Sequence, residues 1–259
     1  MGKKSKKKPF DGWSYNKRWK RAGCIADRLI DHICDLIHIN ASNEWVVYGA
    51  LAKRIPRSYA ANAFNRFRHA AHHYELIRLT AMWDAPRDDR VSFPTIIALL
   101  DFPEVTDLLR SSVFEHWAGP DASANEEPIN ALRRIILERA KEKRDEAPDN
   151  LKKLSKLCTD IAASDELKAL REFRNNYIAH NLDFSEVDDR AKQKPKYKDE
   201  TNLLQASIPI ADGFHQLLNG SSFGFDSAQE HAKKNSEELW GKADFNIVDR
   251  SKKPKKSDT

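Results

Sequence analysis

Apolar residues recur at intervals of three and four along most of the chain, the spacing that places them on one face of an α-helix. The first such stripe runs from about Lys20 to Asn40 and consists of Ile25, Leu29, Ile33, Leu36 and Ile37. A longer one runs from about Ser58 to Trp83, and its predicted buried face consists of Phe64, Phe67, Ala71, Tyr74 and Ile77.

Capping residues and prolines divide the remainder of the chain. Ser42 can cap a helix that Pro56 ends, and two short helices are expected to start near Phe93-Pro94 and Phe102-Pro103. Further helices are predicted over 126–146, from Asp149 onward, from Ser164 to His180, and over 203–218. The polar segment 183–200 is expected to be an exposed loop.

This pattern predicts an all-α protein. Only nine glycines are present, few for a chain of strands and tight turns. We expect one helical domain over residues 20–220. A disordered basic tail over 1–19 and an irregular basic tail over 221–259 should flank it.

The net charge of +5 is unevenly distributed. Residues 1–21 contribute +8 and residues 249–259 contribute +3, so the rest of the chain carries −6. Such tails attract polyanions without sequence preference, although a lysine run by itself is more often only a solvated terminus.

Several classes of protein are disfavoured. No apolar run approaches the length of a membrane helix, and lysines rather than an apolar stretch follow Met1, so neither a membrane span nor a secretory signal is expected. Cys24, Cys34 and Cys158 form no CxxC pair, which argues against a zinc site or disulfide framework and favours a reducing, cytoplasmic location. Nucleotide-binding glycine loops and the Gly-x-Ser-x-Gly motif are absent.

The segment 167–181 carries the candidate chemistry. At about 100° per residue, Leu167, Leu170, Phe173, Tyr177 and Ile178 form one apolar arc of a helix. Arg174 falls inside this arc and His180 falls on its edge. An arginine there must meet a carboxylate, backbone carbonyls or a solvent-filled cleft, because burying its charge unpaired is costly.

Two interpretations of Arg174 and His180 are open at this point. A cleft lined by arginine, asparagine and histidine suits a phosphodiester, since the guanidinium can bind phosphate oxygens and the imidazole can exchange protons. Alternatively, Arg174 is half of a structural ion pair in a helical scaffold, and His180 complements the helix dipole.

The sequence Arg174-Asn175-Asn176-Tyr177-Ile178-Ala179-His180 resembles the signature of HEPN proteins: an arginine, a polar residue directly after it, and a histidine four to six residues further on. Within that superfamily the chain resembles the AbiU-like group, related to the bacterial abortive-infection protein U. The aromatic helix 63–80 and the turn Met82-Trp83-Asp84 leading to Phe93 are similar to the corresponding parts of that group. The resemblance covers about residues 20–185.

The resemblance implies a helical bundle that forms homodimers and cleaves RNA without a metal or other cofactor, in phage defence or a toxin–antitoxin-like role with an antitoxin or regulatory partner. It implies that Arg174, Asn175 and His180 are catalytic, and Arg171 is the nearest basic candidate for RNA binding. Because some HEPN domains only bind, a non-catalytic module for RNA or a partner protein is the alternative.

Two other groups of residues have ordinary structural explanations. His69 and His73 are spaced to hold a metal on one helix face, but no further Cys/His cluster completes a site, so no metal is expected. Trp83, Phe64 and Phe67 could stack on bases, but aromatic residues at helical spacing usually belong to a core.

Overall fold

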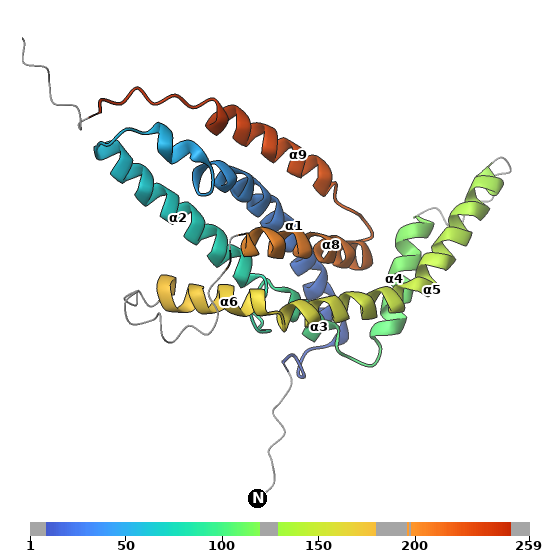
Figure 1. Cartoon of the computed structure of the whole chain (residues 1–259). Coiled ribbons are helices and arrows are strands. Elements are labelled where there is room, and N and C mark those ends of the chain that lie inside the picture. The colour runs from blue at the N-terminus through green and yellow to red at the C-terminus, as the bar shows by residue number, and fades with distance from the viewer. Residues whose placement is uncertain (1–8, 120–128, 180–195, 197, 250–259) are drawn as a thin grey trace, which may run out of the picture.

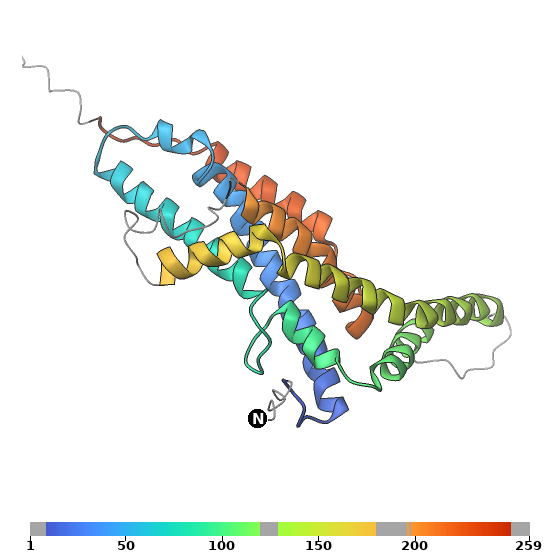
Figure 2. The same ribbon diagram turned by 60° about the horizontal axis from the view of Figure 1, so that its bottom comes forward.

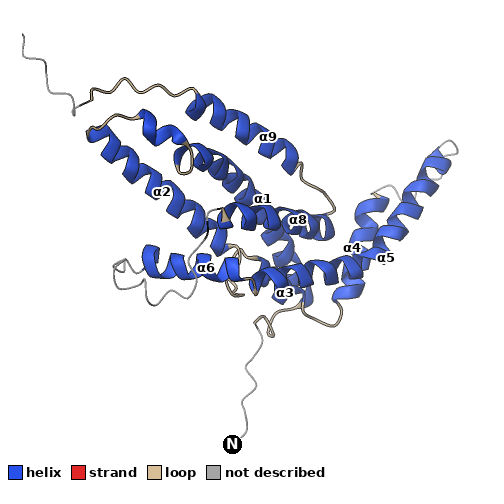
Figure 3. Ribbon diagram, in the orientation of Figure 1, coloured by secondary structure: helices blue, strands red, loops and turns tan. Residues whose placement is uncertain are grey.

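The computed structural model describes residues 9–119, 129–179, 196 and 198–249, and these residues form helices joined by loops, with no strand among them (Figure 3). The predicted all-α class is confirmed. The long helices are α1 (Tyr15–Val46), α2 (Tyr59–Ala81), α5 (Ile129–Ala162) and α8 (Asp199–Asn219). The shorter elements are α3 (Phe93–Leu100), α4 (Val105–Ala118), α6 (Asp165–Phe173), α9 (Phe225–Ser236), a 3-10 turn (Ala50–Arg54) and two π-helical segments (Arg174–Ala179 and Glu237–Gly241).

Helix α1 is the centre of the bundle. It contacts α2, α3, α8 and α9, and its predicted apolar stripe from Ile25 to Ile37 is buried. Helices α4 and α5 pack together as a hairpin that extends away from the bundle before α5 turns back across it (Figures 1 and 2). Helix α6 follows α5 and crosses the end of α2, which places the segment that begins at Arg174 beside α2.

Helix α1 does not end at Asn40 as expected but continues to Val46. The side chains of Asn40 and Asn43 are buried and donate to the carboxylate of Glu75 on α2, at 2.7 and 2.6 Å. An asparagine breaks a helix when its side chain competes for the helix's own backbone. Here Glu75 supplies a better partner, so the helix proceeds through both positions.

The N-terminal boundary predicted at residue 20 is wrong. Ser14 caps α1 by accepting from the amide of Lys17, and Phe10 is buried against the core. Arg18 is buried as well: its Nε donates to the carbonyl of Leu99, and its Nη2 donates to those of Ala98 and Asp101, each at 2.8 Å. Arg18 therefore satisfies carbonyls left free at the end of α3 and is structural rather than part of a solvated tail. Residues 1–8 lie outside the described part of the chain.

Replacing Arg18 with alanine should lower the free energy of unfolding by about 1.5–3 kcal/mol, because it removes a charged donor from three carbonyls. Chemical denaturation measures this change. Lys20→Ala is the matched control on the same helix, since Lys20 is exposed, and it should change stability by less than about 0.5 kcal/mol. Equal effects of the two substitutions would contradict the structural role of Arg18.

The buried face predicted for α2 is also wrong. Phe67, Tyr74 and Ile77 are exposed, whereas Glu75, Leu76, Leu79 and Thr80 are buried. Only the C-terminal half of α2 is inserted into the bundle. Near its N-terminal half, Phe64 and Phe67 instead contact Phe245 and Trp240 of the C-terminal segment, with ring centroids 6.2 and 6.1 Å apart.

Two further boundaries differ from the prediction. The helices expected on either side of residue 148 are one helix, α5, which contains Pro148 and bends along its length (Figure 1). A proline removes one helical hydrogen bond without ending a helix that tertiary contacts hold on both sides. The segment 221–259 is not irregular throughout, because α9 and the π-helical segment Glu237–Gly241 lie within it and pack on α1. Residues 250–259 lie outside the described chain.

Candidate functional site

The segment that follows α6 is positioned by capping and by burial. Ser164 accepts from the amide of Leu167 and caps α6, as predicted, and Leu167 and Leu170 are buried. From Arg174 to Ala179 the chain is π-helical and not α-helical as expected. Widened turns of this kind are rare and often occur at functional sites. The π-helical turn begins at Arg174, so it changes the orientation of the residues after Arg174 relative to a regular α-helix.

Arg174 reaches across to the end of α2. Its Nη1 donates to Asp84 Oδ1 at 3.1 Å and to Thr80 Oγ1 at 3.3 Å, and its Nε donates to Asn175 Oδ1 at 3.2 Å. The side chains of Arg174 and Asp84 are 20% and 15% exposed, so the pair is neither sealed in the core nor fully solvated. Arg174 Nη2 forms no hydrogen bond with any residue in the described ranges. Two of the three guanidinium nitrogens are thus anchored, and the third has no partner among the described residues.

Asp84 is shared between two arginines. Arg90 binds Asp84 Oδ2, while Arg174 binds Oδ1. Arg171 donates to the backbone carbonyl of Trp83, directly before Asp84, and burial lowers the pKa of its guanidinium. Three guanidinium groups therefore surround one carboxylate, which leaves a formal excess of two positive charges suited to an anion.

The turn that carries Asp84 is held from several sides. Trp83 is fully buried, stacks near Phe93 at a centroid distance of 4.7 Å and donates from its indole to Ser207 on α8 at 3.2 Å. The amide of Phe93 donates to the carbonyl of Met82 at 2.8 Å. A turn fixed in this way holds the Asp84 carboxylate in place and, through it, Arg174.

Three of the four residues predicted for the site are brought together: Arg174 and Asn175 are hydrogen-bonded, and Arg171 lies one helical turn before them. His180 lies outside the described residues. Asp84, Arg90 and Thr80 were missed. The signal for Asp84 was present in the motif Met82-Trp83-Asp84, but sequence alone does not tell which acid an arginine about ninety positions away will meet.

If Arg174 is half of a structural ion pair, its partner is Asp84. This pairing does not exclude the chemical interpretation, because the ion pair uses only one nitrogen of the guanidinium. The same contact that holds Arg174 can also orient it for a ligand.

His69, His72 and His73 of α2 lie close to one another. No group of three or more histidine, cysteine, aspartate or glutamate side chains within the described ranges is arranged to hold a metal ion. His72 is half-buried, and burial, followed by the charges of His73 and His69, lowers its pKa to about 4. Its Nε2 lies 3.5 Å from Glu200 Oε1, and burial also raises the pKa of Glu200. Because burial opposes the charged form of both groups and the distance is long, we regard this as a polar contact rather than an ion pair.

Of the three aromatic residues expected to belong to a core, only one is fully buried. Trp83 belongs to the core, as expected, whereas Phe67 is exposed and Phe64 is partly so. His73 packs against Phe173 at a centroid distance of 6.4 Å, so the histidine-bearing face of α2 adjoins the residue directly before Arg174.

Comparison with known proteins shows which family the chain belongs to. None of the helices in the described part has the length and apolar character that a bilayer crossing requires. Neither the curated proteins nor the solved structures contain a match. The family model for AbiU2, a HEPN family, matches residues 24–239, which include the bundle, the Arg174 segment, α9 and most of the π-helical segment after it. The chain therefore belongs to the AbiU2 family of HEPN proteins.

Proposed function

We propose that this protein is a metal-independent endoribonuclease that acts in phage defence or as a toxin. The observation that supports this most strongly is the state of Arg174: Asp84 and Thr80 anchor its Nη1, while its Nη2 has no partner among the described residues. A guanidinium held at two of its nitrogens, whose third has no partner among the described residues, is suited to bind a phosphate oxygen without having to reorganise.

In the proposed reaction, the 2′-hydroxyl oxygen of a ribose attacks the adjacent phosphorus atom while the bond from phosphorus to the 5′-oxygen breaks. The proton leaves the 2′-hydroxyl, and a proton is delivered to the departing 5′-oxygen. The products are a 2′,3′-cyclic phosphate and a 5′-hydroxyl. His180 moves the proton, Arg174 stabilises the negative charge that builds on the phosphoryl oxygens, and Asn175 orients the phosphate or the histidine.

Arg171 and Arg90 add positive charge beside this position. Arg171 is fixed by the Trp83 carbonyl and Arg90 by Asp84, so neither is ideally placed to donate to the reacting phosphate itself. Their role in the proposal is to attract the RNA backbone, because the chain between the two basic tails carries a net negative charge.

The active species in this proposal is a homodimer. Two copies of the 165–181 segment would meet near a two-fold axis and form one cleft with two sets of catalytic residues. An antitoxin or another regulatory protein that covers this cleft would silence the enzyme in the cytoplasm.

The experiment is RNA cleavage by the purified protein in excess EDTA. We expect cleavage, products that end in 2′,3′-cyclic phosphate, and activity that co-elutes with a particle of dimeric mass. His180→Ala should reduce the rate by about a hundredfold or more. His231→Ala, an exposed histidine on α9, is the matched control and should cleave at the wild-type rate.

Absence of cleavage, with RNA still bound, would support the second candidate function: a non-catalytic HEPN module that binds RNA or a partner protein. The contact between Arg174 and Asp84 favours this alternative, since it already occupies part of the guanidinium.

A further inference from the structure

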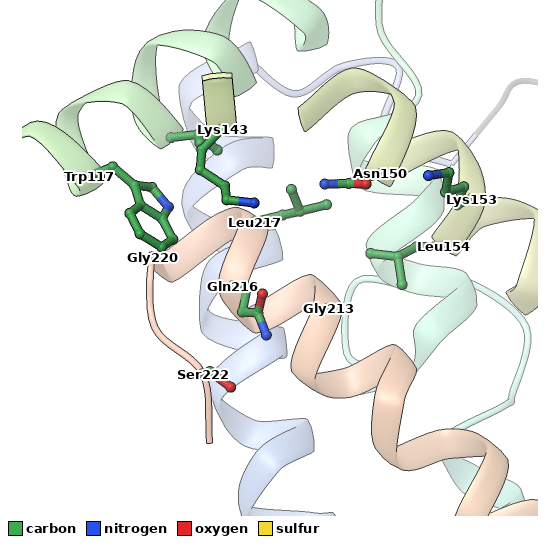
Figure 4. A pocket seen from close by; sticks show the side chains of 11 residues that line it. Trp117, Lys143, Asn150, Lys153, Leu154, Gly213, Gln216, Leu217, Gly220 and Ser222 are labelled. Carbon is green, nitrogen blue, oxygen red and sulfur yellow. The ribbon is translucent and has the colours of Figure 1, made fainter. Parts of the chain in front are cut away.

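A hollow lies away from Arg174, between the end of α4, the middle of α5 and the C-terminal half of α8 (Figure 4). Its volume is about 600 Å³, within the range of about 300–1,000 Å³ that is typical of small-molecule sites. None of its lining residues takes part in the contacts of Arg174. Whatever binds there would be recognised independently of the HEPN signature.

The charged residues that line this pocket are both cations. Lys143 and Lys153 contribute ammonium groups, and no aspartate or glutamate lines it. Lys143 Nζ is bonded at 2.9 Å to Glu146, but Lys153 has no hydrogen bond or ion pair within the described ranges. Asp212 accepts hydrogen bonds from the lining residues Gln216 and Ser222 and from the amide of Phe223, so its carboxylate is already bound by three donors. The pocket therefore favours an anion.

An exposed aromatic ring forms one side of the same pocket. Trp117, in the last turn of α4, is 44% exposed, although an indole of this size is ordinarily covered. Leu154 and Leu217 are buried beneath the opening. Figure 4 shows Lys143 and Asn150 between the indole and Lys153. The Asn150 carboxamide forms no side-chain hydrogen bond within the described ranges, so a donor and an acceptor remain available to a ligand.

Helical spacing and one glycine shape this hollow. Lys143 and Asn150 are seven residues, or about two helical turns, apart on α5, so both side chains lie on one face of the helix and line the same opening. Gly213 allows α5 to approach α8: a Cβ atom there would lie 2.7 Å from Leu154 Cδ2. Gly213 and Leu154 both line the hollow, so this close packing forms part of its wall.

From these observations we propose that the pocket binds a nucleotide. The base stacks on Trp117, the phosphate lies between Lys143 and Lys153, and Asn150, which lies between the two lysines (Figure 4), hydrogen-bonds to the phosphate. Stacking on an aromatic ring combined with lysine–phosphate contacts is how proteins bind nucleotides without a glycine-rich loop. The same chemistry is offered by a free nucleotide and by one unit of an RNA strand.

The test is isothermal titration calorimetry of the full chain with four probes: adenosine 5′-monophosphate, adenosine, inorganic phosphate and a 2′-O-methyl oligoadenylate. The oligoadenylate lacks the attacking 2′-hydroxyl and cannot be cleaved. We expect the monophosphate or the oligoadenylate to bind, and adenosine and phosphate to bind at least tenfold more weakly. The tighter of the two nucleotide probes identifies the source, a free nucleotide or a strand.

Variants locate the binding in the pocket. Lys153→Ala and Trp117→Ala should each weaken nucleotide binding at least fivefold, and Trp117→Phe, which keeps a stacking ring, should weaken it less. Lys152→Ala is the matched control, because Lys152 is adjacent on α5 but is paired with Asp149 outside the pocket.

Three results would overturn the proposal. The first is no heat of binding for either nucleotide probe at millimolar concentration. The second is phosphate binding as tightly as the nucleotide. The third is binding that survives Lys153→Ala and Trp117→Ala but disappears in Arg174→Ala, which would assign it to the HEPN site.

Discussion

Arg174→Ala should slow RNA cleavage by about a hundredfold or more while the protein melts close to the wild-type temperature. The loss of rate is expected because the guanidinium would no longer stabilise charge that appears only in the transition state. The small change in stability is expected because Asp84 keeps its second partner, Arg90, after Arg174 is removed. We expect a cost of about 1 kcal/mol, typical of a partly exposed pair.

A double substitution separates this explanation from a purely structural one. Arg90→Ala alone should also cost little, since Arg174 still pairs with Asp84. Arg90→Ala combined with Arg174→Ala strands a largely buried carboxylate and should cost about 3–5 kcal/mol, more than the sum of the single changes. Arg87→Ala is the control for loss of charge in the same turn, because the Arg87 side chain is exposed and pairs with Asp89 rather than with Asp84.

Two measurements decide the outcome: initial rates of RNA cleavage and thermal denaturation followed by circular dichroism. A variant with Arg174→Ala that is unfolded at room temperature would make Arg174 a structural residue. A folded variant that cuts RNA at the wild-type rate would remove Arg174 from the mechanism.

What could be predicted from the sequence was decided by local chemistry. The stripe of α1 is buried as its spacing indicated, α3 begins at Phe93 as expected, and Ser164 caps α6 as predicted. In each case the residues that determine the structure are within a few positions of one another. Periodicity shows that a face is apolar, and a cap shows where a helix begins.

What could not be predicted depends on a partner distant in sequence. The aromatic stripe of α2 was periodic, but most of it faces outward, because only the end of α2 enters the bundle. In the sequence, Arg18 is one of several basic residues near the N-terminus. In the structure it is buried, because it donates to carbonyls at the end of α3. In the candidate site, the pairing of Arg174 with Asp84 could not be predicted for the same reason. No residue near Arg174 in the sequence indicates which acid it will meet.

Glu75→Ala should be among the most destabilising single substitutions in the bundle, at about 3–5 kcal/mol. Glu75 is fully buried on α2 and accepts from Asn40 and Asn43 of α1. Its removal would take the shortest acceptor from two buried amide groups, at about 1–3 kcal/mol each, and leave a cavity in addition. Asn40 would keep only Thr201 Oγ1 at 3.0 Å, and Asn43 only the carbonyl of Ala71 at 3.5 Å. Glu44→Ala is the matched control, because Glu44 is an exposed glutamate beside Asn43.

The difference in stability between the wild type and Glu75→Ala should also depend on pH. Burial raises the pKa of Glu75 above its ordinary 4.5, although the two asparagine donors partly oppose this. The native state therefore holds this proton more tightly than the unfolded chain does, so the advantage of the wild type should grow as the pH falls from neutral towards about 4.5. Urea denaturation of both proteins at several pH values measures the slope. An advantage that shrinks on acidification would mean that the native state favours the ionised carboxylate, and that the two asparagines outweigh the burial of the charge.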